Sequence, residues 1–162
     1  APGAALVSLE SVKAIGHDNK AWLPTRWLEL SKARNDFVQC VSSPEQSLPA
    51  NVLKVITPTF RHALAVLSVA KAFTGPEGGL HHGAAAVGTP AVVLFGGFIS
   101  PAVTGYSKHC NLFTGSGLGC GNRLSCAHCR ECMQQITVER VMTALRGVFA
   151  ENSTERTAHE VG

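Results

Sequence analysis

The feature that most constrains the fold is a continuous apolar run, Ala91–Phe95, which follows an alanine-rich stretch at Leu80–Val87 across a short Gly-Thr-Pro turn. A strand that is apolar at every position is typical of a parallel sheet with both faces covered, because a sheet with one wet face alternates apolar and polar residues. The alanine-rich stretch predicts a helix that packs closely on the same sheet. Together they indicate an α/β fold.

Short apolar segments alternate with helical patterns along the rest of the chain. Further strands are predicted over 36–41, 52–56 and 72–74, and further helices over 23–34, 61–72 and 137–150. Alternation of this kind favours a Rossmann-like open parallel sheet with helices on both faces. We predict one domain over residues 1–150, followed by a polar, disordered tail over 151–162.

The composition excludes several classes of protein. The chain has 162 residues, of which 45% are hydrophobic and 15% are charged, whereas an average soluble domain has about 25% charged residues. Such a chain is neither intrinsically disordered nor a coiled coil. Its net charge is only +3 and no dense run of Lys or Arg occurs, so we expect no nucleic-acid partner.

The segment between Gly78 and Ser107 contains no Asp, Glu, Lys or Arg. A membrane-spanning helix needs about 20 apolar residues in a row, and here glycines, prolines and histidines interrupt the run, so we interpret it as buried helix, strand and loop. The first ten residues have neither a basic region nor a long apolar core, so we expect no signal peptide. The expected location is therefore cytoplasmic, where cysteines are thiols or metal ligands rather than disulfides.

A glycine-rich turn predicts an anion-binding site. Residues Phe73–Gly79, FTGPEGG, join the end of a strand to the predicted helix. Unpaired N–H groups at a helix N-terminus bind anions, and glycines let a ligand approach the backbone. His81 and His82 fall in the first turn of this helix, where an imidazole can donate a hydrogen bond to the anion. An ordinary turn with two surface histidines is the alternative.

The residues around this turn carry a family resemblance. GPEGGLHHGAAAVGTPAVVLFG, Gly75–Gly96, resembles the signature of glycosyltransferase family nine, the heptosyltransferase-like enzymes of lipopolysaccharide synthesis. NKAWLPTRWLEL, Asn19–Leu30, is similar to the Lys-x-Trp-Pro segment that opens a helix in the C-terminal half of these enzymes. The Cys-rich stretch, the Cys132-Met133 pair and the helix near Val138 follow in the same order. The resemblance covers residues 16–145.

The resemblance implies that this chain is the C-terminal, donor-binding half of a two-domain GT-B fold. The donor-binding residues that it implies are Lys20, Glu77, Gly78, Gly79, Leu80 and His82. Lys20, His82 and the backbone N–H groups would hold the diphosphate, and Glu77 would bind sugar or ribose hydroxyls. His81 would face solvent or the sugar. The catalytic residues are unknown, because the base would belong to an N-terminal GT-B half that acts as partner.

The implied activity is inverting transfer of a heptose-like sugar from an ADP- or UDP-linked donor to a lipopolysaccharide or other glycan or lipid-linked acceptor, without a catalytic metal. The chain alone would then be inactive as a transferase. Such an enzyme would work in the bacterial cytoplasm, at the periphery of the inner membrane. The alternative is a non-catalytic nucleotide- or zinc-binding module.

Four cysteines cluster in the Cys-rich stretch 110–133, which we predict as a loop. They are Cys120, Cys126, Cys129 and Cys132, with the spacing C-x5-C-x2-C-x2-C. Zinc prefers four sulfur or nitrogen ligands in a tetrahedron, and a C-x2-C turn supplies two thiolates at the right separation. We interpret the cluster as a structural zinc site. An iron–sulfur cluster, a disulfide pair and unligated thiols remain alternatives.

Overall fold

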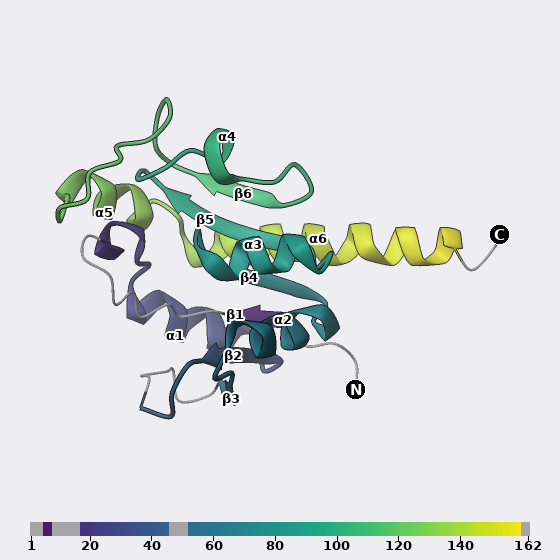
Figure 1. Cartoon of the computed structure of the whole chain (residues 1–162). Coiled ribbons are helices and arrows are strands. Elements are labelled where there is room, and N and C mark those ends of the chain that lie inside the picture. The colour runs from purple at the N-terminus through teal and green to yellow at the C-terminus, as the bar shows by residue number, and fades with distance from the viewer. Residues whose placement is uncertain (1–4, 8–16, 46–51, 160–162) are drawn as a thin grey trace.

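The computed structural model describes residues 5–7, 17–45 and 52–159. In this part of the chain, a six-stranded, fully parallel sheet has the strand order β3-β2-β1-β4-β5-β6 (Figure 1). The strands are β1 (Ala5–Val7), β2 (Phe37–Val41), β3 (Leu53–Ile56), β4 (Ala72–Pro76), β5 (Ala91–Gly96) and β6 (Cys110–Phe113). The helices are η1 (His17–Lys20, a 3-10 helix), α1 (Pro24–Ala33), α2 (Phe60–Val69), α3 (Gly79–Ala86), α4 (Pro101–Thr104), α5 (Ala127–Gln134) and α6 (Val138–His159).

Helices cover both faces of the sheet, as the apolar run predicted. Helices α1 and α6 pack together over one face, and α2 and α3 pack together over the other. Successive residues of β5 serve the two cores in turn: Val92 and Leu94 join the α1/α6 core, while Val93 and Phe95 join the α2/α3 core. All six residues of β5 are buried. The predicted α/β, Rossmann-like fold is confirmed.

Local signals set several helix starts. Thr59 caps α2 by accepting a hydrogen bond from the His62 N–H, and Pro24 occupies the first turn of α1, where its missing N–H costs nothing. Trp22 and Trp27 meet edge to face at 4.8 Å between ring centroids and are each 3% exposed. They therefore anchor the start of α1 in the core. Among the described residues, no helix combines the length and the apolar character that crossing a bilayer requires.

The prediction was wrong for the C-terminal tail and for the Cys-rich stretch. Helix α6 does not end at Ala150 but runs to His159, because the polar residues 151–159 contain neither Gly nor Pro and so continue the helix. Residues 160–162 lie outside the described residues. The stretch 110–133 is not all loop, since it contains β6 and α5. Strand β6 has only four residues and α5 begins inside the cysteine pattern, so neither had a periodic signal of useful length.

Candidate functional site

The sheet order places the candidate site between β1 and β4. Strands β2 and β3 extend the sheet on one side of this junction, and β5 and β6 extend it on the other. Ligands of such sheets bind beyond the carboxyl ends of the strands where the order reverses, because the connections diverge there and leave a crevice. Helix η1 is the next described element after β1, and Glu77 directly follows β4. The two meet at this junction.

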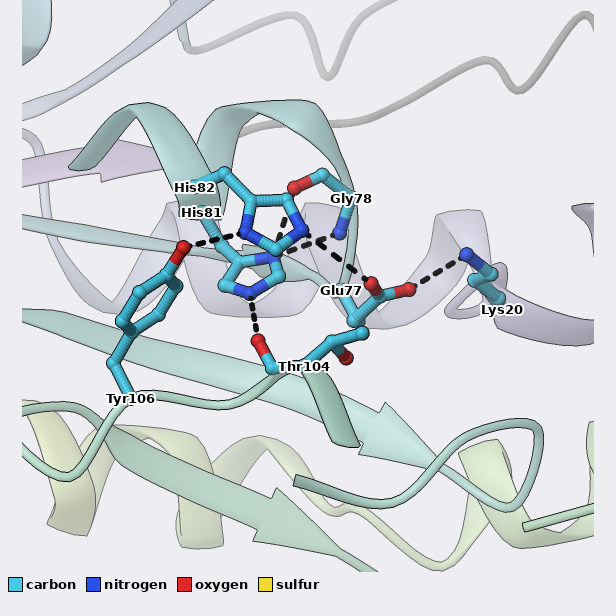
Figure 2. A network of polar contacts seen from close by, with 7 residues as sticks. All are labelled: Lys20, Glu77, Gly78, His81, His82, Thr104 and Tyr106. Atoms are coloured by element: carbon cyan, nitrogen blue, oxygen red, sulfur yellow. Dashed lines mark hydrogen bonds and ion pairs between the residues drawn. The ribbon is translucent and has the colours of Figure 1, made fainter. Parts of the chain in front are cut away.

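Lys20 and Glu77 form a short ion pair at the centre of the site (Figure 2). The Lys20 Nζ lies 2.6 Å from the Glu77 Oε2, and the two side chains are 15% and 6% exposed. The same Nζ lies over the Phe98 ring, 5.0 Å from its centroid. An ammonium group has three donors and this ion pair uses one, so Lys20 retains donors for an incoming anion.

The start of α3 supplies backbone donors beside this pair. Helix α3 begins at Gly79 with Gly78 as its N-cap, and the first N–H groups of a helix have no partner within the helix. A Cβ added at Gly79 would meet only the Phe60 ring, at 3.8 Å, which is ordinary van der Waals contact. Gly79 therefore leaves the backbone open without being required by packing. Leu80, the next residue, packs against the α2/α3 core.

The sequence placed His81 toward solvent or the sugar, but its side chain is fully buried. Its Nε2 lies 2.9 Å from the Thr104 carbonyl oxygen, which can only accept, so Nε2 carries the hydrogen. Its Nδ1 lies 2.9 Å from the Gly78 backbone nitrogen, which can donate to it, and 2.8 Å from the Gly78 carbonyl oxygen. Gly78 has no side chain with which to cap α3, and the imidazole of His81 takes over part of that role. His81 thereby ties the start of α3 to the end of α4.

His82 is the histidine that reaches the ion pair. Its Nδ1 lies 2.8 Å from the Tyr106 hydroxyl and its Nε2 lies 3.9 Å from the Glu77 Oε1, while 44% of its side chain is exposed (Figure 2). Because Nε2 faces a carboxylate, the arrangement favours a hydrogen on Nε2 and donation from the Tyr106 hydroxyl to Nδ1. Burial is the main cause that lowers the pKa of His82 below its ordinary value; His81 and Lys20 lower it further, and Glu77 raises it.

Two further residues of this cluster, Tyr106 and His109, were not predicted from the sequence. Their rings lie 5.3 Å apart between centroids, and each lies close to His81. His109 is 8% exposed, and its Nδ1 is buried without a hydrogen-bond partner among the residues that the structure describes. Burial lowers the pKa of His109, and the neighbouring His81 adds to this effect. The available signal was that Tyr106, the only tyrosine of the chain, lies near the end of a long stretch without charged residues.

Glu77, His81 and His82 also offer ligand atoms within 4.8 Å of one another, which is close enough for a metal ion. Both nitrogens of His81 already engage backbone groups, however. A metal would have to break one of these buried hydrogen bonds. The cluster is therefore better described as a polar network around Lys20 than as a metal site.

Three of the four predicted metal-binding cysteines come together. The Sγ atoms of Cys120, Cys126 and Cys129 lie within 4.8 Å of one another, and all six cysteines of the chain are free thiols. Hydrogen bonds from Cys129 are the main cause that lowers the pKa of Cys126. Burial, with hydrogen bonds to the other two thiols, raises the pKa of Cys129 to about 12. The cysteines therefore form no disulfide bond in this structure, unlike the disulfide alternative.

Cys132 stands apart from this three-cysteine group. It lies one helical turn beyond Cys129 on α5, where its side chain packs against Gly97: a Cβ added at Gly97 would lie 2.7 Å from the Cys132 Sγ. The same Sγ lies 3.6 Å from the Nε2 of His128. The structure thus brings together three of the four cysteines in the predicted set, and the fourth is a buried packing residue.

Comparison with known proteins identifies the fold. No protein-family model matches the chain, and none of the curated proteins matches it. Solved structures do: the ADP-heptose lipopolysaccharide heptosyltransferase II of E. coli is 21% identical with a TM-score of 0.68, over 94% of this chain and 48% of that one. The iron-containing dodecameric glycosyltransferase TibC of enterotoxigenic E. coli is 15% identical with a TM-score of 0.71, over 93% and 46%.

A third match is the glycosyl transferase family 9 protein of Veillonella parvula, which is 14% identical with a TM-score of 0.64, over 92% of this chain and 47% of that one. The chain has the fold of one half of these glycosyltransferases. It spans about half the length of the solved chains that it matches. The family resemblance drawn from Gly75–Gly96 is therefore confirmed at the level of the fold.

Proposed function

We propose that this chain is the C-terminal, donor-binding half of an inverting glycosyltransferase of family nine. Its donor is a nucleoside diphosphate sugar, ADP- or UDP-linked and heptose-like, and its acceptor is a lipopolysaccharide or another glycan. An N-terminal half supplies the acceptor site and the catalytic base, at the cytoplasmic side of a bacterial inner membrane. The solved neighbour named for ADP-heptose makes ADP the first nucleotide to test.

The observation that carries this proposal is the ion pair of Lys20 and Glu77 at the strand-order reversal, beside the start of α3. Sugar transfer leaves a nucleoside diphosphate, whose developing negative charge must be stabilised. The Lys20 ammonium, the free N–H groups of Gly79 and Leu80, and the positive end of the α3 dipole can supply that stabilisation without a metal. Glu77 holds Lys20 in place and offers an acceptor for sugar or ribose hydroxyls.

Calorimetry with ADP and UDP tests the proposal. The wild-type chain should bind at least one of them, and Lys20→Ala should weaken that binding about tenfold or more, because a charge-assisted hydrogen bond contributes roughly 1.5–3 kcal/mol. Lys54→Ala is the matched control, since Lys54 is exposed on β3 and donates to the Pro44 carbonyl. Failure of both nucleotides to bind, or equal binding by Lys20→Ala, would overturn the proposal. The isolated chain should transfer no sugar, and measurable turnover would contradict the proposal that the N-terminal half supplies the catalytic base.

We also propose that Cys120, Cys126 and Cys129 hold one structural zinc ion. Three sulfur ligands fit zinc, and a water molecule or an exogenous ligand would complete the tetrahedron. The ion would tie the chain around Cys120 to the start of α5. TibC is described as iron-containing, so elemental analysis of protein purified without chelator should measure both metals. About one metal ion per chain supports the site, and three titratable thiols without metal would refute it.

A further inference from the structure

One buried side chain, Asn19, joins η1 to the cysteine-rich segment. Asn19 is fully buried, and its Nδ2 donates to two backbone carbonyl oxygens, those of Asn122 and Leu124, each at 2.8 Å. Its Oδ1 accepts the Cys126 N–H at 2.8 Å. Both functional atoms of the amide are therefore engaged by one short stretch of backbone more than 100 positions away in the sequence.

The segment that Asn19 holds has no secondary structure of its own. Residues 114–126 form neither helix nor strand, and three glycines in this stretch, Gly117, Gly119 and Gly121, have positive φ. The backbone groups of an irregular segment have no partners in a helix or a sheet, so they bind water or groups from elsewhere in the chain. The Asn19 amide is the hydrogen-bond partner of three of these groups: the carbonyl oxygens of Asn122 and Leu124 and the N–H of Cys126.

The contacts of the neighbouring residue reinforce the same connection. The Asp18 carboxylate accepts the Ser125 hydroxyl at 3.1 Å and lies 3.8 Å from an Arg130 guanidinium nitrogen. Helix η1 packs against α5 at this end of the molecule (Figure 1). Asp18 and Asn19 together fix the backbone of η1 to residues 122–130, directly before Lys20.

We propose that Asn19 is a positioning residue for Lys20, an inference that rests on the proposed donor site. Lys20 has a long, flexible side chain, so its Nζ stays at the strand-order reversal only if its backbone is held there. Asn19 holds it by anchoring η1 to the segment 122–126, and the Glu77 carboxylate then captures the ammonium. The cysteine-rich segment thereby helps to position Lys20 at the anion site, although it need not touch the ligand.

A double-mutant cycle measured by calorimetry tests this role. Asn19→Ala should raise the Kd for ADP about tenfold in the wild-type background and less than about twofold in the Lys20→Ala background, because it acts through Lys20. Binding of adenosine, which has no phosphate, should not change. Thr89→Val is the matched control: Thr89 is also buried and donates to a backbone carbonyl, that of Leu67 at 2.7 Å, but it lies before the amino end of β5, whereas Glu77 lies beyond the carboxyl end of the parallel strand β4. It should leave ADP binding unchanged.

A second variant guards against a failure of Asn19→Ala to fold. Asn19→Asp keeps the size of the side chain and the acceptor for the Cys126 N–H, but places a carboxylate against two carbonyl oxygens; it should weaken ADP binding in the same Lys20-dependent way. Either variant binding ADP like wild type below its melting temperature would overturn the positioning role. So would a loss that persists undiminished without Lys20. If the wild-type chain itself bound no nucleotide, the proposed donor site would be wrong. This result is distinct from any result obtained with the Asn19 variants.

Discussion

The polar network around Lys20 and the three-cysteine group adjoin the same short helix, η1, yet they are built differently. The network uses residues at or next to the ends of regular elements: Lys20 ends η1, Glu77 follows β4 and His82 lies in the first turn of α3. The cysteine group draws Cys120 from an irregular segment and Cys129 from α5. The structure brings Lys20, Glu77 and His82 together as the sequence predicted, whereas the cysteine set lost Cys132, which lies on α5.

The helix geometry of α5 explains the loss. Residues three apart on a helix share a face, but they are separated by about 4.5 Å along the axis. Cys126 caps α5 and Cys129 lies in its first turn, whereas Cys132 lies one turn farther along the helix and packs against Gly97. The C-x2-C spacing is compatible with a shared metal ion, but it does not determine where the second side chain packs, and here the Cys132 side chain lies against Gly97.

The largest effect that we expect concerns the backbone of the network. Gly79→Val should abolish detectable ADP binding, because a branched side chain at the start of α3 blocks the approach of a diphosphate to the N–H groups. The variant should still fold, since a Cβ at Gly79 meets only Phe60 at 3.8 Å. Calorimetry together with thermal melting separates these two effects.

Gly83→Val provides the contrasting control on the same helix. A Cβ at Gly83 would lie 2.9 Å from the Leu64 Cδ2 and 3.1 Å from the Phe60 ring. Overpacking of this kind costs about 1–3 kcal/mol, so this variant should melt at a lower temperature. Wild-type ADP affinity in Gly79→Val would place the diphosphate elsewhere on the molecule.

A second prediction separates the cysteines. Cys120→Ser and Cys126→Ser should each remove most of the bound metal, whereas Cys132→Ser should retain it, because Cys132 packs against Gly97 instead of joining the group. Elemental analysis of the three proteins after identical purification gives the metal content directly. Equal metal loss in Cys132→Ser would restore the four-cysteine site that the spacing alone suggested.

A third prediction divides the two adjacent histidines by role. His82→Ala should weaken ADP binding about tenfold by removing one charge-assisted hydrogen bond, with little change in the melting temperature. His81→Ala should instead destabilise the fold by about 2–4 kcal/mol, because it leaves the Gly78 N–H and the Thr104 carbonyl unpaired around a cavity. Denaturant unfolding and calorimetry on both variants make the comparison. If His81→Ala remained stable but no longer bound ADP, His81 rather than His82 would be the ADP-binding histidine.

The sequence predicted the layers of the fold well and its irregular parts poorly. Ala91–Phe95 could be read as a buried strand because every position is apolar, and all of it is buried. Ala5–Val7 and Cys110–Phe113 were missed, because three or four residues do not establish a period. Their place in the sheet is set by pairing with β4 and β5, which no local pattern records.

The candidate site shows the same division. Its elements were predictable from the glycine-rich turn and the family resemblance, but the roles of His81 and His82 were not. Adjacent residues of a helix differ in side-chain direction by about 100°, and the packing of α3 on β4 and β5, which the local sequence does not record, sets which imidazole points inward. Asn19 was invisible for a different reason, since its partners are backbone groups of a segment without secondary structure.

The smallest expected effect is a pH dependence that arises at the edge of the network. The pKa values of His82 and His109 are both lowered in the folded protein, mainly by burial. At a pH between the lowered and the ordinary values the unfolded chain binds more protons, so the free energy of unfolding rises with pH. Stability should therefore fall as the pH drops through the ordinary histidine value of about 6.5, and the fall should cease below the lowered pKa values.

Of these two histidines, His109 should contribute the larger share. Its Nδ1 is buried without a partner among the described residues, so a second N–H on this ring would have no acceptor there, whereas 44% of the His82 side chain meets solvent. Urea unfolding of the wild type, His109→Gln and His82→Gln between about pH 8 and pH 5.5 measures the slopes rather than the absolute stabilities. The slope should flatten most in His109→Gln. An unchanged slope of the free energy of unfolding against pH in both variants would show that the acid sensitivity of this fold arises outside His82 and His109.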